Sequence, residues 1–327
     1  MPPKPSLIYY PDSEPGIRRL RRGRGFSYIA PDGTTIAASA ERARIAALAV
    51  PPAYEDVWIC PRPDGHLQAT GRDARARKQY RYHPDWTAFR AEMKYSGLPA
   101  FGAALPRLRR AILRDLQAGA GDQAFAIAAV LLMIDRLSIR VGNPAYASLN
   151  GSFGATTLRR RHLRLTPSGL RLDYTAKGGL RVRATIADRT LNRVLTALDD
   201  LPGKSLAKWV DGSGAARPVT SDQVNARLAE LVGDAGATAK TFRTWNGSVA
   251  ALEAALAEER PTVRSLSQAA AARLHNTPAV ARGSYIHPRV IELASDDAAT
   301  RALLTRNLPP VQGLRQPERA LLRLLEG

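Results

Sequence analysis

The chain has 327 residues, with 48 lysines and arginines against 29 aspartates and glutamates, so its formal net charge is +19. A hydrophobic fraction of 45% is typical of a folded globular protein and excludes a disordered basic tail. The length favours about two domains of roughly 150 residues each. The positive charge therefore belongs to a folded surface and indicates a polyanionic partner, with nucleic acid ahead of an anionic membrane.

Several classes of protein are excluded by what the sequence lacks. The longest apolar run, residues 124–134, has 11 residues, whereas a membrane-spanning helix needs about 20. No apolar signal region follows the first five residues, which predicts an intracellular, cytoplasmic protein. Cys60 is the only cysteine, no histidine pair has a metal-ligand spacing and no complete P-loop is present. We therefore expect no disulfide, no metal site, no use of ATP and no other cofactor.

The first 90 residues are predicted to be rich in β-structure. Residues 26–30 and 34–36 flank a Pro-Asp-Gly turn, and residues 57–60 and 66–68 flank another, as in β-hairpins. A short helix is expected at residues 39–49, which Pro51 and Pro52 terminate.

The remaining residues are predicted to be mainly helical, with three short strands among them. Asp122 is placed as the N-cap of an apolar helix that we expect to be central. The strands, separated by turns at 167–169 and 177–179, are residues 163–165, 170–174 and 180–186. The helices are residues 105–117, 122–137, 189–200, 221–232, 241–258 and 261–274. The pattern indicates an α+β protein with a small β-rich domain at residues 1–90 and a larger, mainly helical domain with a small antiparallel sheet at residues 91–327.

Four places carry unusual polar residues at the edges of predicted elements. Arg140 follows the apolar helix, Lys177 lies on a glycine-rich turn, Lys240 and Arg243 begin a helix, and Tyr285 lies among small and polar residues. Each has an ordinary explanation, such as a cation at a helix C-terminus or an exposed lysine. Together they supply what transesterification of a phosphodiester requires: a nucleophilic hydroxyl, arginines that balance the phosphate charge, and a proton for the leaving oxygen.

These residues and their surroundings resemble one family. The segments IRVGN, YTAKGGLRV, KTFRTWN and NTPAVARGSYIHP, together with residues 50–86, are similar to the type IB DNA topoisomerases, in particular the small bacterial and poxvirus members. The resemblance implies that Tyr285 forms a 3′-phosphotyrosyl link and that Arg140 and Arg243 hold the scissile phosphate. It also implies that Lys177 protonates the 5′-hydroxyl, assisted by Lys240, and that the two domains form a clamp around duplex DNA.

One position departs from the family pattern. The poxvirus and eukaryotic members have a histidine nine residues before the nucleophile, where this chain has Asn276. Asparagine can donate a neutral hydrogen bond to a phosphate oxygen but cannot carry a positive charge, so we expect weaker transition-state stabilisation. The adjacent His275 is assigned no catalytic role.

The N-terminal domain contains a second candidate site, rich in cations and aromatic residues. Such residues serve phosphate contacts and contacts to bases, and the resemblance places Gln79, Tyr80 and Tyr82 near the major groove. The predicted DNA-binding residues are Arg72, Arg75, Arg77, Lys78, Gln79, Tyr80 and Tyr82. The arginine-rich run at residues 18–24 has no specific counterpart in the family, and a solvated face or general attraction to phosphate is expected there.

The resemblance implies a monomeric enzyme that relaxes positive and negative supercoils without metal or ATP. Two alternatives stay open. A tyrosine recombinase shares an Arg/Lys/Arg/Tyr set, but generally has His-x-x-Arg where this chain has Lys240 and Arg243, and its N-terminal domain is helical. A non-catalytic DNA-binding protein would account for the charge but not for the joint occurrence of Arg140, Lys177, Arg243 and Tyr285.

Overall fold

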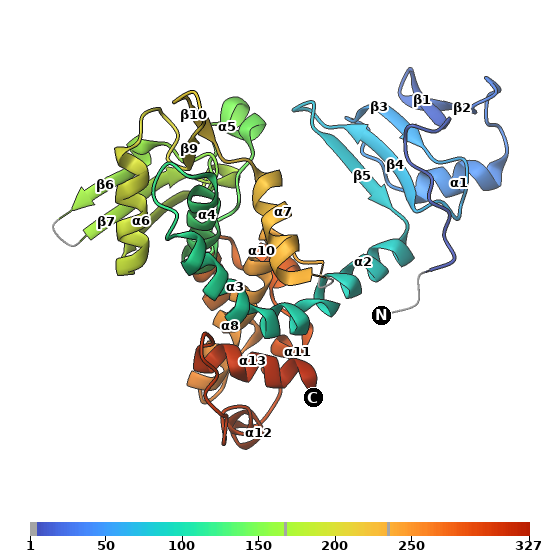
Figure 1. Cartoon of the computed structure of the whole chain (residues 1–327). Helices are drawn as coiled ribbons and strands as arrows, with labels where there is room; N and C mark the ends of the chain where they lie inside the picture. The colour runs from blue at the N-terminus through green and yellow to red at the C-terminus, as the bar shows by residue number, and fades with distance from the viewer. Residues whose placement is uncertain (1–4, 167–168, 234–235) are drawn as a thin grey trace. The chain divides into compact units, whose positions relative to one another are not determined.

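The computed structural model describes residues 5–166, 169–233 and 236–327. The chain divides into two compact units, Met1–Ser96 and Gly97–Gly327, called here the first and second units. Figure 1 shows strands prevailing in the first unit and helices in the second. The boundary predicted after residue 90 falls inside helix α2 (Pro84–Ser96), which belongs to the first unit. No helix among the described residues is both long and apolar enough to span a membrane.

The first unit is built on one antiparallel sheet of five strands in the order β2-β1-β3-β4-β5. Its elements are β1 (Ile17–Arg22), β2 (Gly25–Ile29), α1 (Ser39–Ala47), β3 (Glu55–Ile59), β4 (Leu67–Arg72), β5 (Lys78–Tyr82) and α2. A small core gathers Ile17, Val57, Ile59 and Ala69 from the sheet against Ile45 of α1. The predicted pairing of β3 with β4 is thus present, and β5 extends it.

The arginine-rich run at residues 18–24 is largely a strand, which the sequence did not predict. β1 pairs with both β2 and β3; its Ile17 is buried, while the residues after it are exposed or half-buried. The Arg19 guanidinium lies 4.3 Å from the Phe26 ring centroid and donates hydrogen bonds to the carbonyl groups of residues 50, 51 and 54. The hairpin predicted after β2 keeps its turn, but its second arm is reduced to a single bridge at Thr35.

The second unit consists of helices and two small sheets. The helices are α3 (Leu98–Asp115), α4 (Gln123–Leu137), α5 (Pro144–Asn150), α6 (Arg189–Asp200), α7 (Ser221–Val232), α8 (Ala239–Ala257), α9 (Val263–Leu274), α10 (Pro278–Tyr285), α11 (Pro288–Glu292), α12 (Ala298–Leu303) and α13 (Gln316–Glu326). The strands β6 (Leu163–Thr166), β7 (Gly169–Thr175) and β8 (Arg181–Ile186) form one antiparallel sheet, and β9 (Lys208–Val210) pairs with β10 (Ala216–Pro218). The predicted turn at 167–169 lies partly outside the described residues, since 167 and 168 are not described.

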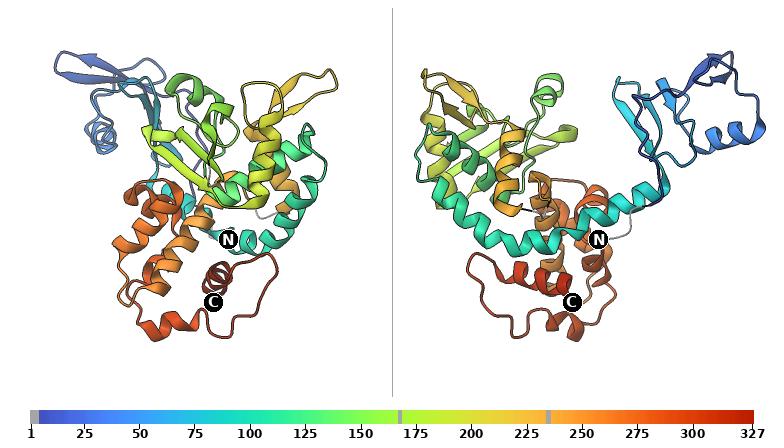
Figure 2. Two further views of the ribbon diagram at one scale, coloured as in Figure 1. Left: turned by 90° about the vertical axis from the view of Figure 1, so that its left-hand side faces the viewer. Right: turned by 45° about the vertical axis from the view of Figure 1, so that its right-hand side comes forward.

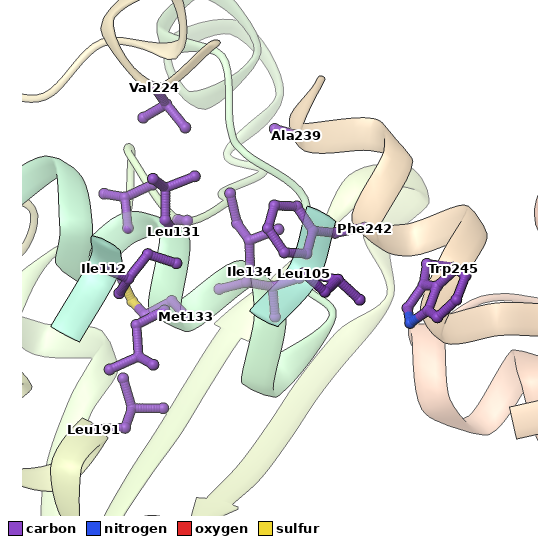
Figure 3. Close-up of a cluster of buried hydrophobic side chains, with 14 of the residues drawn as sticks. Leu105, Ile112, Leu131, Met133, Ile134, Leu191, Val224, Ala239, Phe242 and Trp245 are labelled. Carbon is purple, nitrogen blue, oxygen red and sulfur yellow. The ribbon is translucent and has the colours of Figure 1, made fainter. Parts of the chain in front are cut away.

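Helices α4 and α8 form the centre of the second unit. The Asp122 carboxylate accepts a hydrogen bond from the Ala124 amide at 2.7 Å, so it is the N-cap that the sequence predicts for α4. Figure 3 shows Phe242 and Trp245 of α8 in one apolar cluster with side chains of α3 and α4. Helices α8, α9 and α10 pack side by side, as Figure 2 shows in orange. This packing brings the ends of several elements together, and the candidate site lies there.

Candidate active site

Tyr285 and Arg243 lie against each other. Tyr285 is the last residue of α10 and is only 9% exposed, and Arg243, in the first turns of α8, is 2% exposed. The Arg243 guanidinium carbon lies 4.9 Å from the centroid of the Tyr285 ring. Gly247 of α8 makes this approach possible, because a Cβ there would lie 2.8 Å from the Tyr285 carbonyl oxygen. The two helices therefore hold a phenol and a guanidinium in contact.

Main-chain carbonyl groups orient Arg243. Its Nη1 donates to the carbonyl oxygen of Ser138, just after α4, and its Nη2 donates to that of Leu274, at the end of α9, at 3.0 Å. Burial and the nearby Arg140 guanidinium lower the pKa of Arg243, against an opposing influence of Tyr285. Within the described residues, no carboxylate forms an ion pair with it. The position thus keeps an uncompensated positive charge beside Tyr285.

The side chains of Arg140 and Asn276, which are 136 positions apart in the sequence, are hydrogen-bonded. The Arg140 Nη2 donates to Asn276 Oδ1 at 2.5 Å, while the buried Asn276 Nδ2 has no partner within the described residues. The Ala155 amide donates to the Arg140 carbonyl oxygen at 2.8 Å, and only a glycine fits at 154, because a Cβ would lie 2.5 Å from that oxygen. A guanidinium and an unpartnered amide N–H therefore lie side by side at this point.

The surrounding cations favour the ionised form of Tyr285. Burial raises the pKa of this phenol, but Arg243, Arg140 and Lys240 together outweigh that effect and hold the pKa below its ordinary value. A phenol that ionises more readily is a better nucleophile near neutral pH. His275 lies in the same surroundings, and burial together with the three neighbouring arginines lowers its pKa.

Lys177 and Lys240 are exposed and less tightly placed. Lys177 begins the short 3-10 turn η2 (Lys177–Gly179) between β7 and β8, where Gly178 and Gly179 have positive φ. The end of β7 adjoins the segment beside Arg140, since the Phe153 amide donates to the Thr175 carbonyl oxygen at 2.8 Å. No hydrogen bond or ion pair within the described part of the chain restrains the Lys177 ammonium. The structure thus places Lys177 on an exposed turn between β7 and β8.

Two family models match the chain. Residues 84–287 match the catalytic core of eukaryotic DNA topoisomerase I, and residues 25–73 match the N-terminal domain of bacterial DNA topoisomerase IB. A curated relative, the DNA topoisomerase 1B of Acanthamoeba polyphaga mimivirus, is 28% identical over 293 residues, which cover 85% of this chain and 87% of the relative. The chain belongs to the type IB DNA topoisomerase family. It is thus an enzyme, a DNA topoisomerase, and its α+β fold is the one that the sequence predicts.

Of the predicted DNA-binding residues of the first unit, only Arg72 falls within the ranges that the two type IB topoisomerase models match. These residues lie on two paired strands and on the turn between them. Arg72 ends β4, Arg75 and Arg77 lie in the following turn, and the others form β5. Three of the cations face carboxylates of the same unit: Arg72 lies 3.3 Å from Asp56, Arg77 lies 2.7 Å from Asp73, and Lys78 pairs with Asp12.

The two tyrosines of β5 are exposed on this surface, as are its cations. The Tyr80 and Tyr82 rings stack at 6.0 Å with an interplanar angle of 9°, and they are 49% and 45% exposed. Gln79 is held by a 3.0 Å hydrogen bond from its Nε2 to Asp73. The aromatic rings are therefore available for contacts with bases, whereas most of the cations are partly neutralised within the sheet.

Three polar residues that the sequence analysis did not single out support the site. The Ser138 carbonyl oxygen accepts a hydrogen bond from Arg243, and the Ser138 hydroxyl accepts one from Asn246, which lies about one turn after Arg243 on α8. The Ser248 hydroxyl donates to the Tyr285 carbonyl oxygen at 3.3 Å. Asn246 and Ser248 could have been noticed as polar residues within an apolar helix. Nothing local marks Ser138. No group of three or more His, Cys, Asp or Glu side chains that could hold a metal is found in the described part of the chain.

Proposed function

We propose that this type IB topoisomerase relaxes positive and negative supercoils in duplex DNA by nicking one strand, letting the free end rotate and resealing the strand. Tyr285 is the nucleophile and becomes linked to the 3′-phosphate. The observation that carries the proposal is the convergence of Tyr285 with Arg243, Arg140 and Asn276, which come from segments far apart in the chain. A buried phenol with a lowered pKa among uncompensated cations suits an attack on a phosphodiester.

The reaction exchanges one ester bond for another. The Tyr285 phenol loses its proton to solvent and its oxygen forms a bond to phosphorus, while the bond from phosphorus to the 5′-oxygen breaks. The Lys177 ammonium gives a proton to the departing 5′-oxygen, with Lys240 assisting. Resealing runs the same steps in reverse, so the number of phosphate ester bonds is conserved and no ATP is needed.

The charge that builds up on the phosphate is balanced by the protein. Arg140 and Arg243 provide the guanidinium groups, and the unpartnered Nδ2 of Asn276 provides a neutral N–H for a non-bridging oxygen. This set supports a reaction that requires no metal ion. Because Asn276 is uncharged, it stabilises the transition state less than a protonated histidine would.

The first unit supplies further DNA contacts in this proposal. Tyr80 and Tyr82 approach bases, Gln79 reads a base edge, and the cations Arg72, Arg75, Arg77 and Lys78 contact phosphates. The predicted domains, residues 1–90 for DNA binding and residues 91–327 for catalysis, close around the duplex as a clamp. We also propose that the enzyme acts as a monomer in the cytoplasm, associated with the nucleoid.

Supercoiled plasmid tests the proposal directly. The wild-type protein and Tyr285→Phe are each incubated with the plasmid in EDTA without nucleotide. The wild type should relax both signs of supercoil and leave a covalent protein–DNA adduct after denaturation, whereas Tyr285→Phe should bind DNA without relaxing it. Retarded but unrelaxed plasmid with the wild type would indicate a DNA-binding protein, and joining of specific sites between two duplexes would indicate a recombinase.

A further inference from the structure

Asn246 is a buried amide in the centre of the apolar helix α8. It is 1% exposed, and a buried amide destabilises the fold unless its hydrogen-bonding groups find partners. Its Nδ2 donates to two acceptors at the end of α4, the Asp135 carbonyl oxygen at 3.1 Å and the Ser138 hydroxyl oxygen at 3.0 Å. The amide thus fastens the last turn of α4 to α8.

The same turn of α4 holds Arg243. The Ser138 carbonyl oxygen accepts from Arg243, while the Ser138 hydroxyl accepts from Asn246. Arg243 and Asn246 are three residues apart on α8, so their side chains project from the same face. Ser138 itself has φ 55° and ψ 22°, a left-handed conformation that is unfavourable for a residue other than glycine. The Asn246 amide holds this turn from outside α4, together with the Arg243 guanidinium.

The orientation of Arg243 depends on very few contacts. Two main-chain carbonyl oxygens, those of Ser138 and Leu274, accept from its terminal nitrogens, and its buried Nε has no partner within the described residues. One of these two carbonyl groups belongs to the turn that Asn246 fastens. A shift of that turn therefore moves the guanidinium relative to Tyr285.

We propose that Asn246 is a positioning residue, which acts through Ser138 to hold the Arg243 guanidinium where the scissile phosphate binds. The inference rests on the role proposed for Arg243. Asn246 itself is not proposed to contact DNA. Because misplacement of a catalytic group by about 1 Å can slow a reaction roughly 100-fold, loss of this amide should appear in the rate of strand cleavage and not in DNA affinity.

A double-mutant cycle tests this inference. Single-turnover cleavage of a short duplex is measured for the wild type, Asn246→Ala, Arg243→Ala and the double variant. Asn246→Ala should cleave roughly 10- to 100-fold more slowly than the wild type, with the dissociation constant for DNA unchanged. In the Arg243→Ala background the same substitution should change the rate by less than about 2-fold, because the group that it positions is already gone.

Asn192→Ala is the matched control. Asn192 also donates from Nδ2 to a main-chain carbonyl oxygen, that of Ile186, at 2.9 Å. In both asparagines Oδ1 is buried without a partner in the described part of the chain. Its loss should lower the melting temperature but leave cleavage unchanged. If Asn246→Ala does not fold, Ser138→Gly removes the hydroxyl that Asn246 binds while accommodating the left-handed conformation, and the same non-additive pattern is expected.

Three outcomes overturn the inference. Equal losses from Asn246→Ala with and without Arg243 would show that the residue does not act through Arg243. A similar slowing by Asn192→Ala would show a general structural effect. If wild-type protein forms no covalent adduct with DNA, the proposed function fails, and the inference that rests on it fails too.

Discussion

Two arginines of the second unit, the partly buried Arg109 and the buried Arg243, have contrasting surroundings. Arg109 of α3 donates to both oxygens of Asp135 and both oxygens of Glu318, whose side chains are 1% and 0% exposed. Arg243 of α8 donates to the main-chain carbonyl oxygens of Ser138 and Leu274 and to the Tyr285 side chain, and no carboxylate pairs with it among the described residues. The first arginine joins α3, α4 and α13, whereas the second lies against a tyrosine.

The difference appears in the two pKa values. Burial lowers the pKa of each guanidinium, but the hydrogen bonds and charges of Glu318 and Asp135 reverse this for Arg109 and raise its pKa above the ordinary value. At Arg243 nothing outweighs burial and the neighbouring Arg140. Arg109, paired with two carboxylates, stabilises the fold. The positive charge of Arg243 is not neutralised by a described carboxylate, so it can interact with a nucleophile and an incoming phosphate.

Removing Arg243 should have the largest effect on chemistry. We expect Arg243→Ala to slow cleavage by roughly 1000-fold, because it removes one of the two guanidinium groups at the phosphate and lets the pKa of Tyr285 rise. Single-turnover cleavage at several pH values measures both effects, and the rate of the variant should rise more steeply toward high pH. Cleavage by Arg243→Ala close to the wild-type rate would show that Arg243 has no role in the reaction.

Removing Arg109 should affect stability instead. Arg109→Ala leaves Asp135 and Glu318 buried without their common partner, which should cost about 3–5 kcal/mol of unfolding free energy. Urea unfolding measures this, and cleavage by the folded fraction should be retained. Arg114→Ala is the matched control on the same helix, because its side chain is 69% exposed and its ion pair should contribute less than about 1 kcal/mol.

Lys177 extends the comparison to an exposed cation. Lys177→Ala should slow cleavage by roughly 100-fold or more and leave stability unchanged, because the exposed ammonium is the proposed proton donor. The rate should recover on DNA with a sulfur in place of the bridging 5′-oxygen, a leaving group that needs no proton. Lys204→Ala, another exposed lysine, should be indistinguishable from wild type. If the sulfur substrate does not restore the rate of Lys177→Ala, Lys177 is not the general acid.

The pH dependence of stability should show the smallest effect. Burial raises the pKa of Glu318, but Arg109 and Arg315 outweigh it and lower the pKa to about 2 from 4.5. Because the folded-state pKa is depressed, the contribution is present above pH 4.5 and is lost as the pH falls toward 2, up to about 3 kcal/mol. Urea unfolding between pH 6 and 2.5 measures it. Glu318→Gln should flatten the dependence relative to Glu326→Gln, an exposed residue of the same helix.

Local patterns were sufficient for much of the helical part of the fold. The predicted bounds of α6 and α7 agree with the structure, because Asp188 caps α6, Thr220 and Gln223 form a capping box on α7, and both helices are amphipathic. β1 and β5 were not predicted as strands, since their runs of cations and tyrosines lack a clear alternation of apolar and polar residues. Such strands are specified by their neighbours in the sheet.

The sequence by itself determined the family, the fold class and the candidate residues Arg140, Lys177, Arg243 and Tyr285, because these lie in short segments with distinctive spacing. Only the tertiary structure decided that Arg140 meets Asn276 and that Arg243 is buried against Tyr285, with no carboxylate of the described residues paired to it. It alone revealed Asn246 as a link between α8 and the end of α4. These contacts join residues more than 40 positions apart, and the packing of helices, not any local preference of the chain, sets them.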